Sequence, residues 1–196
     1  QGLADGFFVI PYTVADYLAN IGFGHAPDNE SSPFRQARKE AEDFVKRLFS
    51  IGGKHSPRAL SVELGKIMWQ YCGMARNEKG LCEALEKIPQ LREEFYRNLR
   101  VTGDADNVNP ELECASRLAD FLDLAELMCH DALDRRESCG GHFREEFQTE
   151  DGEAKRDDRH FAHVSVWEYQ GEGKSPRKHK EELKFETVQL AVRSYR

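Results

Sequence analysis

The sequence lacks the features that mark several common classes of protein. It has no GxGxxG, GxxxxGK[ST] or HExxH motif, which excludes the usual loops for dinucleotides and nucleoside phosphates and the common zinc-protease helix. It also has no surplus of basic residues, because 35 acidic residues stand against 28 basic ones and give a formal net charge of −7. Phosphate backbones would on balance repel such a chain, so no nucleic-acid partner is expected.

Cysteines are few, and long apolar runs are absent. The five cysteines are an odd number without paired spacing, as expected of reduced thiols in a cytoplasmic protein. No basic region of a signal peptide opens the chain, because the first Lys or Arg is Arg35. The most apolar stretch, residues 7–19, is shorter than the about 20 residues that a membrane span needs. We therefore expect a cytoplasmic protein without a membrane-spanning helix.

The beginning of the chain reads as the end of a preceding domain. Residues 3–19 are apolar on nearly every side of a helix, which predicts a buried helix. Glycine, proline, asparagine and serine crowd residues 20–32, which predicts a linker. The first five residues contain neither Met nor a turn signal. We therefore expect a fragment or a processed form of a longer protein, in which residues 1–25 end an upstream domain.

The central part of the chain predicts a helical domain at residues 26–147. Three dipeptides pair a capping residue with proline at the first helical position: Ser32-Pro33, Ser56-Pro57 and Asn109-Pro110. Apolar residues recur at helical spacing over 34–48, 60–75, 81–99 and 112–133. The last three helices are long and their connections short, which favours an antiparallel three-helix-bundle-like arrangement.

The last part of the chain, residues 148–196, reads as a charged loop and a β-rich tail. Phe161–Tyr169 and Leu183–Leu190 are the two candidate strands. The loop between them is too long for a tight hairpin, and its stretch Lys174–Lys180 holds four basic residues and no acid. The predicted fold class is therefore mainly α, with a buried helix before the bundle and a β-rich tail after it.

One local pattern has the residue types of a zinc site. Cys139-x-x-His142 and His160-x-x-His163 are two pairs of zinc-ligand types. The competing interpretation is that they are caps, packing groups and exposed imidazoles, since only the first pair lies near glycines. A Cys139–His142 nucleophile would lack a recognisable orienting group or oxyanion hole. We predict no catalytic residue in this chain and keep a small zinc-supported domain as an alternative.

A longer motif carries a family resemblance. The segment from Glu137 reads ESCGGHFREEF and is followed by RDD. It resembles the signature Glu-Ser-Arg-Gly-Ala-His-x-Arg-x-Asp, followed by Arg-Asp-Asp, of the flavoprotein subunits of succinate dehydrogenase and fumarate reductase. The matching residues are Glu137, Ser138, Gly140, His142, Arg144, Arg156, Asp157 and Asp158. Cys139, Gly141 and Glu146 stand where the family has Arg, Ala and Asp.

Three other segments agree with this family and in its order. LGKIMWQYCGMARNEKGL, residues 64–81, is similar to the first bundle helix of the family. Arg193-Ser194-Tyr195 resembles its closing Arg-Ser-Tyr, and residues 1–19 resemble the helix that follows its substrate-binding segment. L-aspartate oxidases share a weaker form of the helical domain, but the Trp167-Glu168-Tyr169 region and the ending fit them less well.

The resemblance implies a parent protein that binds FAD and interconverts succinate and fumarate. Electrons would pass to an iron–sulfur subunit and on to quinone through a membrane anchor subunit, with the protein peripheral on the cytoplasmic face of the inner membrane. The family's FAD fingerprint and substrate-clamping residues lie upstream of Gln1. We therefore expect this chain to bind no flavin and to be inactive alone, because a clamp cannot position substrate against an absent cofactor.

The resemblance also suggests which residues dock on the upstream FAD-binding domain and support flavin retention. These are Glu137, His142, Arg144, Arg156, Asp157, Asp158 and Arg193. Arginine can fork to a carboxylate across a domain junction. In the competing interpretation, Glu137 and Arg144 only hold the helix end to its own tail. A further alternative is an independent helical interaction module that docks on an acidic partner through Lys174–Lys180.

Overall fold

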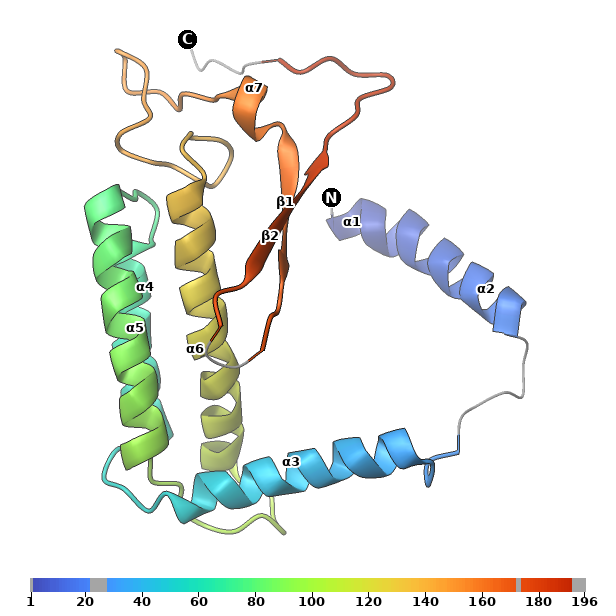
Figure 1. The fold of residues 1–196 in the computed structure, drawn as a ribbon, viewed down its shortest axis with the longest axis vertical. Coiled ribbons are helices and arrows are strands. Elements are labelled where there is room, and N and C mark those ends of the chain that lie inside the picture. The colour runs from blue at the N-terminus through green and yellow to red at the C-terminus, as the bar shows by residue number, and fades with distance from the viewer. Residues whose placement is uncertain (1, 22–27, 172–173, 192–196) are drawn as a thin grey trace. The chain divides into compact units, whose positions relative to one another are not determined.

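The computed structural model describes residues 2–21, 28–171 and 174–191. They form helices and one small two-stranded sheet, so the predicted mainly α class with a β tail is confirmed (Figure 1). The chain divides into two compact units, Gln1–Phe44 and Val45–Arg196. The predicted boundary at residues 25 and 26 lies outside the described residues. No helix of the described residues is long and apolar enough to cross a membrane.

The first unit begins with one helical stretch, formed by α1 (Gly2–Ala4), a π-helical turn η1 (Asp5–Val9) and α2 (Ile10–Ile21). The helix predicted here is confirmed. Its predicted burial is wrong, since these elements contain no buried residue and Phe7 and Tyr12 are 75% and 69% exposed. A lone helix that is apolar all round cannot cover its own faces.

The π-helical turn has a local cause. Ile10 donates its backbone N–H to the carbonyl of Asp5, five residues back. The wider turn comes just before Pro11, whose ring would crowd the carbonyl four residues earlier in a regular α-helix. The chain thus accommodates a proline without ending the helix.

The second unit is built on a three-helix bundle of α4 (Pro57–Tyr71), α5 (Glu78–Asn98) and α6 (Pro110–Asp134). Two of the three predicted helix starts are confirmed as N-caps. The Ser56 side chain accepts the backbone N–H of Ala59, and the Asn109 side chain accepts those of Glu111 and Leu112. Helix α3 (Ser32–Ser50) precedes the bundle, and its last turn belongs to this unit. That turn buries Leu48 completely.

The three bundle helices pack on one another in all three pairs. The colour gradient in Figure 1 shows α5 running in the direction opposite to α6. The backbone N–H of Gly53 donates to the carbonyl of Leu99 at 2.8 Å, which joins the start of α4 to the end of α5. The core is apolar, with Leu60, Leu64 and Ile67 from α4, Leu81, Ile88 and Phe95 from α5, and Leu118, Leu122 and Ala125 from α6. Each large buried side chain contributes about 1.5–3 kcal/mol, so the bundle is the stable part of this unit.

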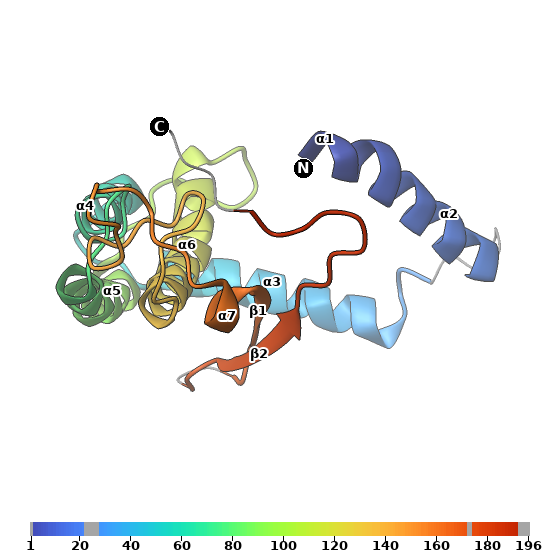
Figure 2. The same cartoon turned by 90° about the horizontal axis from the view of Figure 1, so that it is seen from above.

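After α6 the chain folds over the end of the bundle and then forms a short helix and a hairpin. Helix α7 (Asp158–Phe161) leads into β1 (His163–Glu168), which pairs antiparallel with β2 (Arg177–Glu182). The hairpin lies alongside α6, as Figures 1 and 2 show, and the Trp167 indole N–H donates to Asp131 Oδ1 at 2.7 Å. The first predicted strand is therefore confirmed.

The second predicted strand is wrong, because β2 is formed by the basic run and its following acids rather than by Leu183–Leu190. Polar contacts of the β2 side chains explain the choice. His179 of β2 contacts Glu168 of β1 at 2.7 Å, and Lys178 lies opposite Trp167 and also pairs with Asp134. Opposite-charge and aromatic pairs across strands stabilise a hairpin that has few apolar residues.

Candidate functional site

The signature segment forms a buried polar network over the C-terminal end of α6. Arg144 is its centre and is 1% exposed. Its Nη1 donates to the carbonyl oxygens of Ala132 at 2.9 Å and Leu133 at 3.3 Å. The last carbonyls of a helix have no partner within the helix and carry partial negative charge. The guanidinium therefore satisfies and neutralises the end of α6.

The backbone of Arg144 is held by Ser138. The Ser138 hydroxyl accepts the N–H of Arg144 at 2.8 Å and donates to its carbonyl at 3.2 Å. Ser138 is itself fully buried. These two hydrogen bonds hold the ends of segment 138–144 together and so fix the backbone from which the Arg144 side chain reaches the interior.

Glu146 connects Arg144 with the start of α5. Arg144 Nε donates to Glu146 Oε2 at 3.0 Å, and the other oxygen accepts the backbone N–H of Glu78 at 2.5 Å. Next to it, Glu145 accepts the side-chain N–H of Asn77 at 2.7 Å. The hydrogen bonds to Glu78 and Arg144 lower the pKa of Glu146 below its ordinary value, against the opposing effect of burial. Carboxylates at a helix N-terminus are stabilised in this way.

Glu137 occupies a second buried position, with 2% exposed. Its Oε1 accepts from Arg135 Nε at 2.9 Å, and its Oε2 accepts the backbone N–H of Asp157 at 2.8 Å. Arg135 donates in addition to the carbonyl of Phe161 at 2.8 Å. This pair thus ties the end of α6 to the Arg156-Asp157-Asp158 segment and to α7.

His142 lies half-buried between two arginines. Arg76 Nη1 contacts His142 Nδ1 at 3.1 Å, and His142 Nε2 contacts the carbonyl of Arg135 at 2.9 Å. A guanidinium can only donate, so Nδ1 accepts and the proton of the neutral ring is on Nε2. Burial lowers the pKa of His142 below its ordinary value, and the charges of Arg76 and Arg144 add to this effect.

The Arg-Asp-Asp segment is the more exposed part of the network. Arg156 donates through Nε and Nη2 to Asp158 Oδ1 at 2.9 and 2.6 Å, and through Nη1 to the carbonyl of Ala191 at 2.8 Å. Asp157 caps α7, and its carboxylate contacts His160 Nδ1 at 2.8 Å. The hydrogen bond from His160 holds the pKa of Asp157 below its usual range. Arg193, the remaining predicted member, lies outside the described residues.

Two members of the network were not among the predicted site residues. Arg76 lies in the α4–α5 connection, 66 residues from His142, and Arg135 is the C-capping residue of α6. Arg76 belongs to the segment that resembles the first bundle helix of the family, so the resemblance held a signal for it. Its contact with His142 depends on how α4 and α6 pack, which spacing along the chain does not reveal.

The zinc hypothesis is wrong for the described residues, which include all four predicted ligands. In that part of the chain no group of three or more His, Cys, Asp or Glu side chains is placed to hold a metal ion. His142 uses both ring nitrogens in the network. Cys139 and His142 pair through their backbones instead, in a turn where Gly140 has a φ of +59°. That angle favours glycine, so the glycine serves the turn.

The basic run is partly engaged by the rest of its unit, with Lys178 half-buried and Lys174, Arg177 and Lys180 exposed. Lys178 has a side chain only 14% exposed; it pairs with Asp134 and lies 5.7 Å above the Trp167 ring. His179 is paired with Glu168. Lys178 thus fastens the hairpin to α6, and His179 joins its two strands.

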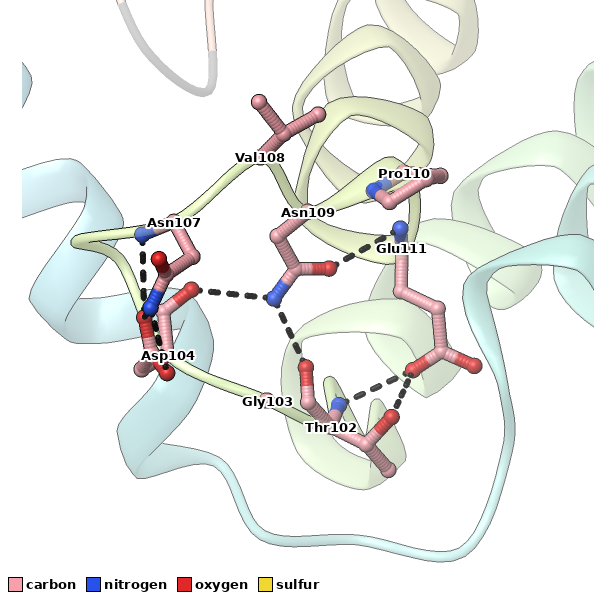
Figure 3. A pocket seen from close by; sticks show the side chains of 8 residues that line it. All are labelled: Thr102, Gly103, Asp104, Asn107, Val108, Asn109, Pro110 and Glu111. Atoms are coloured by element: carbon pink, nitrogen blue, oxygen red, sulfur yellow. Dashed lines mark hydrogen bonds between the residues drawn. The ribbon is translucent and has the colours of Figure 1, made fainter.

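Two surface hollows lie within the second unit. The first lies in the loop before α6, where Asn109 donates to the carbonyls of Thr102 and Asp104 and Glu111 accepts from Thr102 (Figure 3). Its polar groups thus satisfy one another. The second, between α6 and β1, is lined largely by apolar side chains. Beside the first hollow, Asn109 accepts the backbone N–H groups of Glu111 and Leu112. That hollow therefore does not present the free helix N-terminus that binds the phosphates of a dinucleotide such as FAD.

Comparison with known proteins identifies the family. A protein-family model described as fumarate reductase flavoprotein C-term matches residues 61–195. The chain belongs to this family. The fumarate reductase flavoprotein subunit of Serratia sp. is 31% identical over 170 residues, which are 87% of this chain and 27% of that protein. The network described above lies within the part that the family model covers.

Solved structures of this family share the fold of the chain. The E. coli quinol fumarate reductase superposes with a TM-score of 0.71 at 25% identity, over 86% of this chain and 28% of that one. The Mycobacterium smegmatis Sdh1 complex in the apo form gives 0.69 at 25% identity, over 89% and 27%. The chain thus spans about a quarter of the length of the flavoproteins that it matches.

Proposed function

We propose that this chain is the C-terminal helical part of an FAD-dependent flavoprotein that interconverts succinate and fumarate. In the longer protein, electrons pass between the flavin, an iron–sulfur subunit and a quinone, and the assembly is peripheral on the cytoplasmic face of the inner membrane through an anchor subunit. The names of the relatives, which are fumarate reductase flavoprotein subunits, support this proposal. So do the structural neighbours, which are parts of quinol-fumarate reductase and Sdh1 complexes.

The role of this chain within that protein is to support the flavin domain rather than to carry out the reaction. FAD, when bound upstream, supplies the hydride chemistry. The single observation that carries the proposal is the network around Arg144, which is buried and charged and lies in the family signature. Buried charges are costly unless they are paired, and here the pairs fix the shape of residues 135–161.

The network divides into a supporting part and a docking part. Glu137 and Arg144 point into their own unit, where they hold the end of α6. The exposed fractions of the Arg156 and Asp158 side chains are 21% and 36%, so both remain accessible. We assign contact with the upstream FAD-binding domain to this outer pair and to Asp157, and assign His142 to the positioning of the segment between them. Arg193 belongs with them as a proposed member.

The test is the flavin content of the longer flavoprotein that contains this chain. Arg144→Ala is expected to lower the ratio of bound FAD to protein, because the docking residues lose their support. Asp158→Asn, which leaves the buried network intact, is expected to lower flavin retention without unfolding the bundle. The exposed Arg117→Ala on α6 serves as the matched control. Unchanged flavin occupancy in both variants would contradict the proposed role.

A further inference from the structure

His163 begins β1 with a buried side chain that has an unpartnered nitrogen. The residue is 7% exposed, and its Nε2 has no hydrogen-bond partner among the described residues. Its ring lies against that of Phe161, with the two centroids 5.9 Å apart. A neutral imidazole carries a proton on one nitrogen only, whereas the imidazolium carries one on both. In the protonated ring, Nε2 is therefore a buried donor without an acceptor, which is a costly state.

The cations around His163 oppose its protonation as well. Arg135, at the end of α6, lies 6.0 Å from the centroid of the Phe161 ring on which His163 packs. Lys178 and Lys180 alternate along β2 with the residue opposite His163, so they lie on the same face of the sheet as His163. Burial lowers the pKa of His163 below its ordinary value, and these three charges lower it further.

The acids of the adjoining elements do not offset these charges. Glu182 is opposite His163 in the register of the sheet, but it is exposed and makes no hydrogen bond to Nε2. The other acids already have hydrogen-bond partners: Glu137 with Arg135, Asp131 with Trp167, Asp134 with Lys178, Asp157 with His160 and Asp158 with Arg156. A protonated His163 would therefore be a buried charge without a partner.

The element that protonation would move is the β1–β2 hairpin. Polar contacts fasten the hairpin to α6, with Trp167 donating to Asp131 and Lys178 to Asp134. None of the residues of β2 is buried, and His163 is the buried residue of β1. An element with so little buried apolar surface can open while the apolar bundle stays folded. In the open state both nitrogens of His163 reach water, so the imidazolium is no longer disfavoured.

We propose that His163 is a pH-sensitive switch of the hairpin: the neutral ring favours the hairpin docked on α6, and the protonated ring favours its release. The sign follows from the lowered pKa of the docked state. Docking is favoured above the ordinary histidine pKa of about 6.5, and this advantage is lost as the pH falls below it. The switch does not depend on the flavin-supporting role.

The test is hydrogen exchange of the β1 amides of this chain at pH 7.5 and pH 5.5, with the rates corrected for the intrinsic effect of pH. One proton that binds only to the open state raises the opening constant by up to about tenfold over this range. We expect a rise of this size, with the same helix content by circular dichroism at both pH values. No rise in the wild type would overturn the proposal.

His163→Phe keeps a buried ring that cannot be protonated, so the rise should disappear. His160→Phe is the matched control, because the His160 side chain is 63% exposed, and the rise should remain. An unchanged rise in His163→Phe would overturn the proposal. Titration of the His163 ring by NMR in the wild type needs no variant and covers the case in which His163→Phe does not dock. Its midpoint should lie below pH 6.5, and a midpoint at or above that value would also overturn the proposal.

Discussion

Arg144 and Glu146 form a 3.0 Å ion pair that joins the end of one bundle helix to the beginning of another. The arginine holds the last carbonyls of α6, and the carboxylate holds the first N–H of α5. Each side chain therefore serves a helix terminus whose backbone groups lack partners within the helix. Residues of the family signature thus provide hydrogen-bond partners for the end of α6 and the beginning of α5.

Removal of the buried arginine should be costly. Arg144→Ala leaves the α6 carbonyls without a donor, and breaking a buried pair typically costs about 3–5 kcal/mol. We expect Tm to fall by about 10 °C, measured by circular dichroism. Arg117→Ala, which removes an exposed pair with Glu113, should lower stability by at most about 0.5 kcal/mol. Equal Tm values for the two variants would show that the network does not stabilise the fold.

Acid should weaken the unit through the half-buried His142 and the buried His163. Burial lowers the folded-state pKa of both His142 and His163, so the neutral forms favour the folded state. Their contribution to stability is complete above the ordinary histidine pKa of about 6.5 and is lost as the pH falls below it. Urea unfolding at pH 7.5 and pH 5.5 should show the loss.

His142→Gln tests the histidine contribution further. Glutamine can still accept from Arg76 and donate to the Arg135 carbonyl, but it does not titrate. The variant should keep only the part of the pH dependence that His163 contributes. If the dependence between pH 7.5 and pH 5.5 is the same in the variant as in the wild type, protonation of His142 is not coupled to folding.

Two glycines should respond in opposite ways to the same substitution. A Cβ at Gly53 would lie 2.2 Å from the backbone of Asn98, whereas one at Gly65, inside α4, would meet nothing within 4 Å. Gly53→Ala must therefore separate the start of α4 from the end of α5 and lower Tm. Gly65→Ala should raise stability by up to about 1 kcal/mol through helix propensity. A tolerated alanine at residue 53 would contradict the close approach of these two segments.

The hairpin should depend on the hydrogen bond between Trp167 and Asp131. Asp131→Ala removes a charged acceptor, which typically contributes about 1.5–3 kcal/mol. We expect faster hydrogen exchange in β1 and a red-shifted Trp167 emission, measured in a Trp69→Phe background. The exposed Asp120→Ala on α6 is the control and should leave both signals unchanged. A hairpin equally protected in both variants would mean that other contacts hold it to α6.

The sequence predicted the elements whose signals are local. Ser56 and Asn109 act as the expected caps, and the bundle helices follow their apolar periodicity, because capping and periodicity depend on neighbours along the chain. Leu183–Leu190 was the wrong strand, since its apolar residues suited a sheet better than a run of lysines did. The choice of Arg177–Glu182 depends on Asp134 and Glu168, which the fold brings opposite that run.

The site residues also divide into those with a signal in the local sequence and those whose contacts depend on the folded structure. Glu137, His142 and Arg144 were singled out through the family signature, and the structure joins Glu137 and His142 through Arg135, while Arg144 holds the end of α6. Arg76 and Arg135 were missed because their contacts require the packed ends of α4 and α6. The burial expected for residues 3–19 failed for a related reason. An apolar pattern indicates that a helix needs packing partners, but it does not say where they are, and the described residues of the same unit do not bury this helix.

The division of roles between this chain and the rest of the flavoprotein is tested most directly by flavin retention. The purified chain is incubated with FAD, desalted, and examined by its visible spectrum. The account predicts that no flavin absorbance remains with the protein, because it assigns flavin binding to the upstream domain. Stoichiometric retained flavin would contradict it and would mean that this chain itself holds a flavin site.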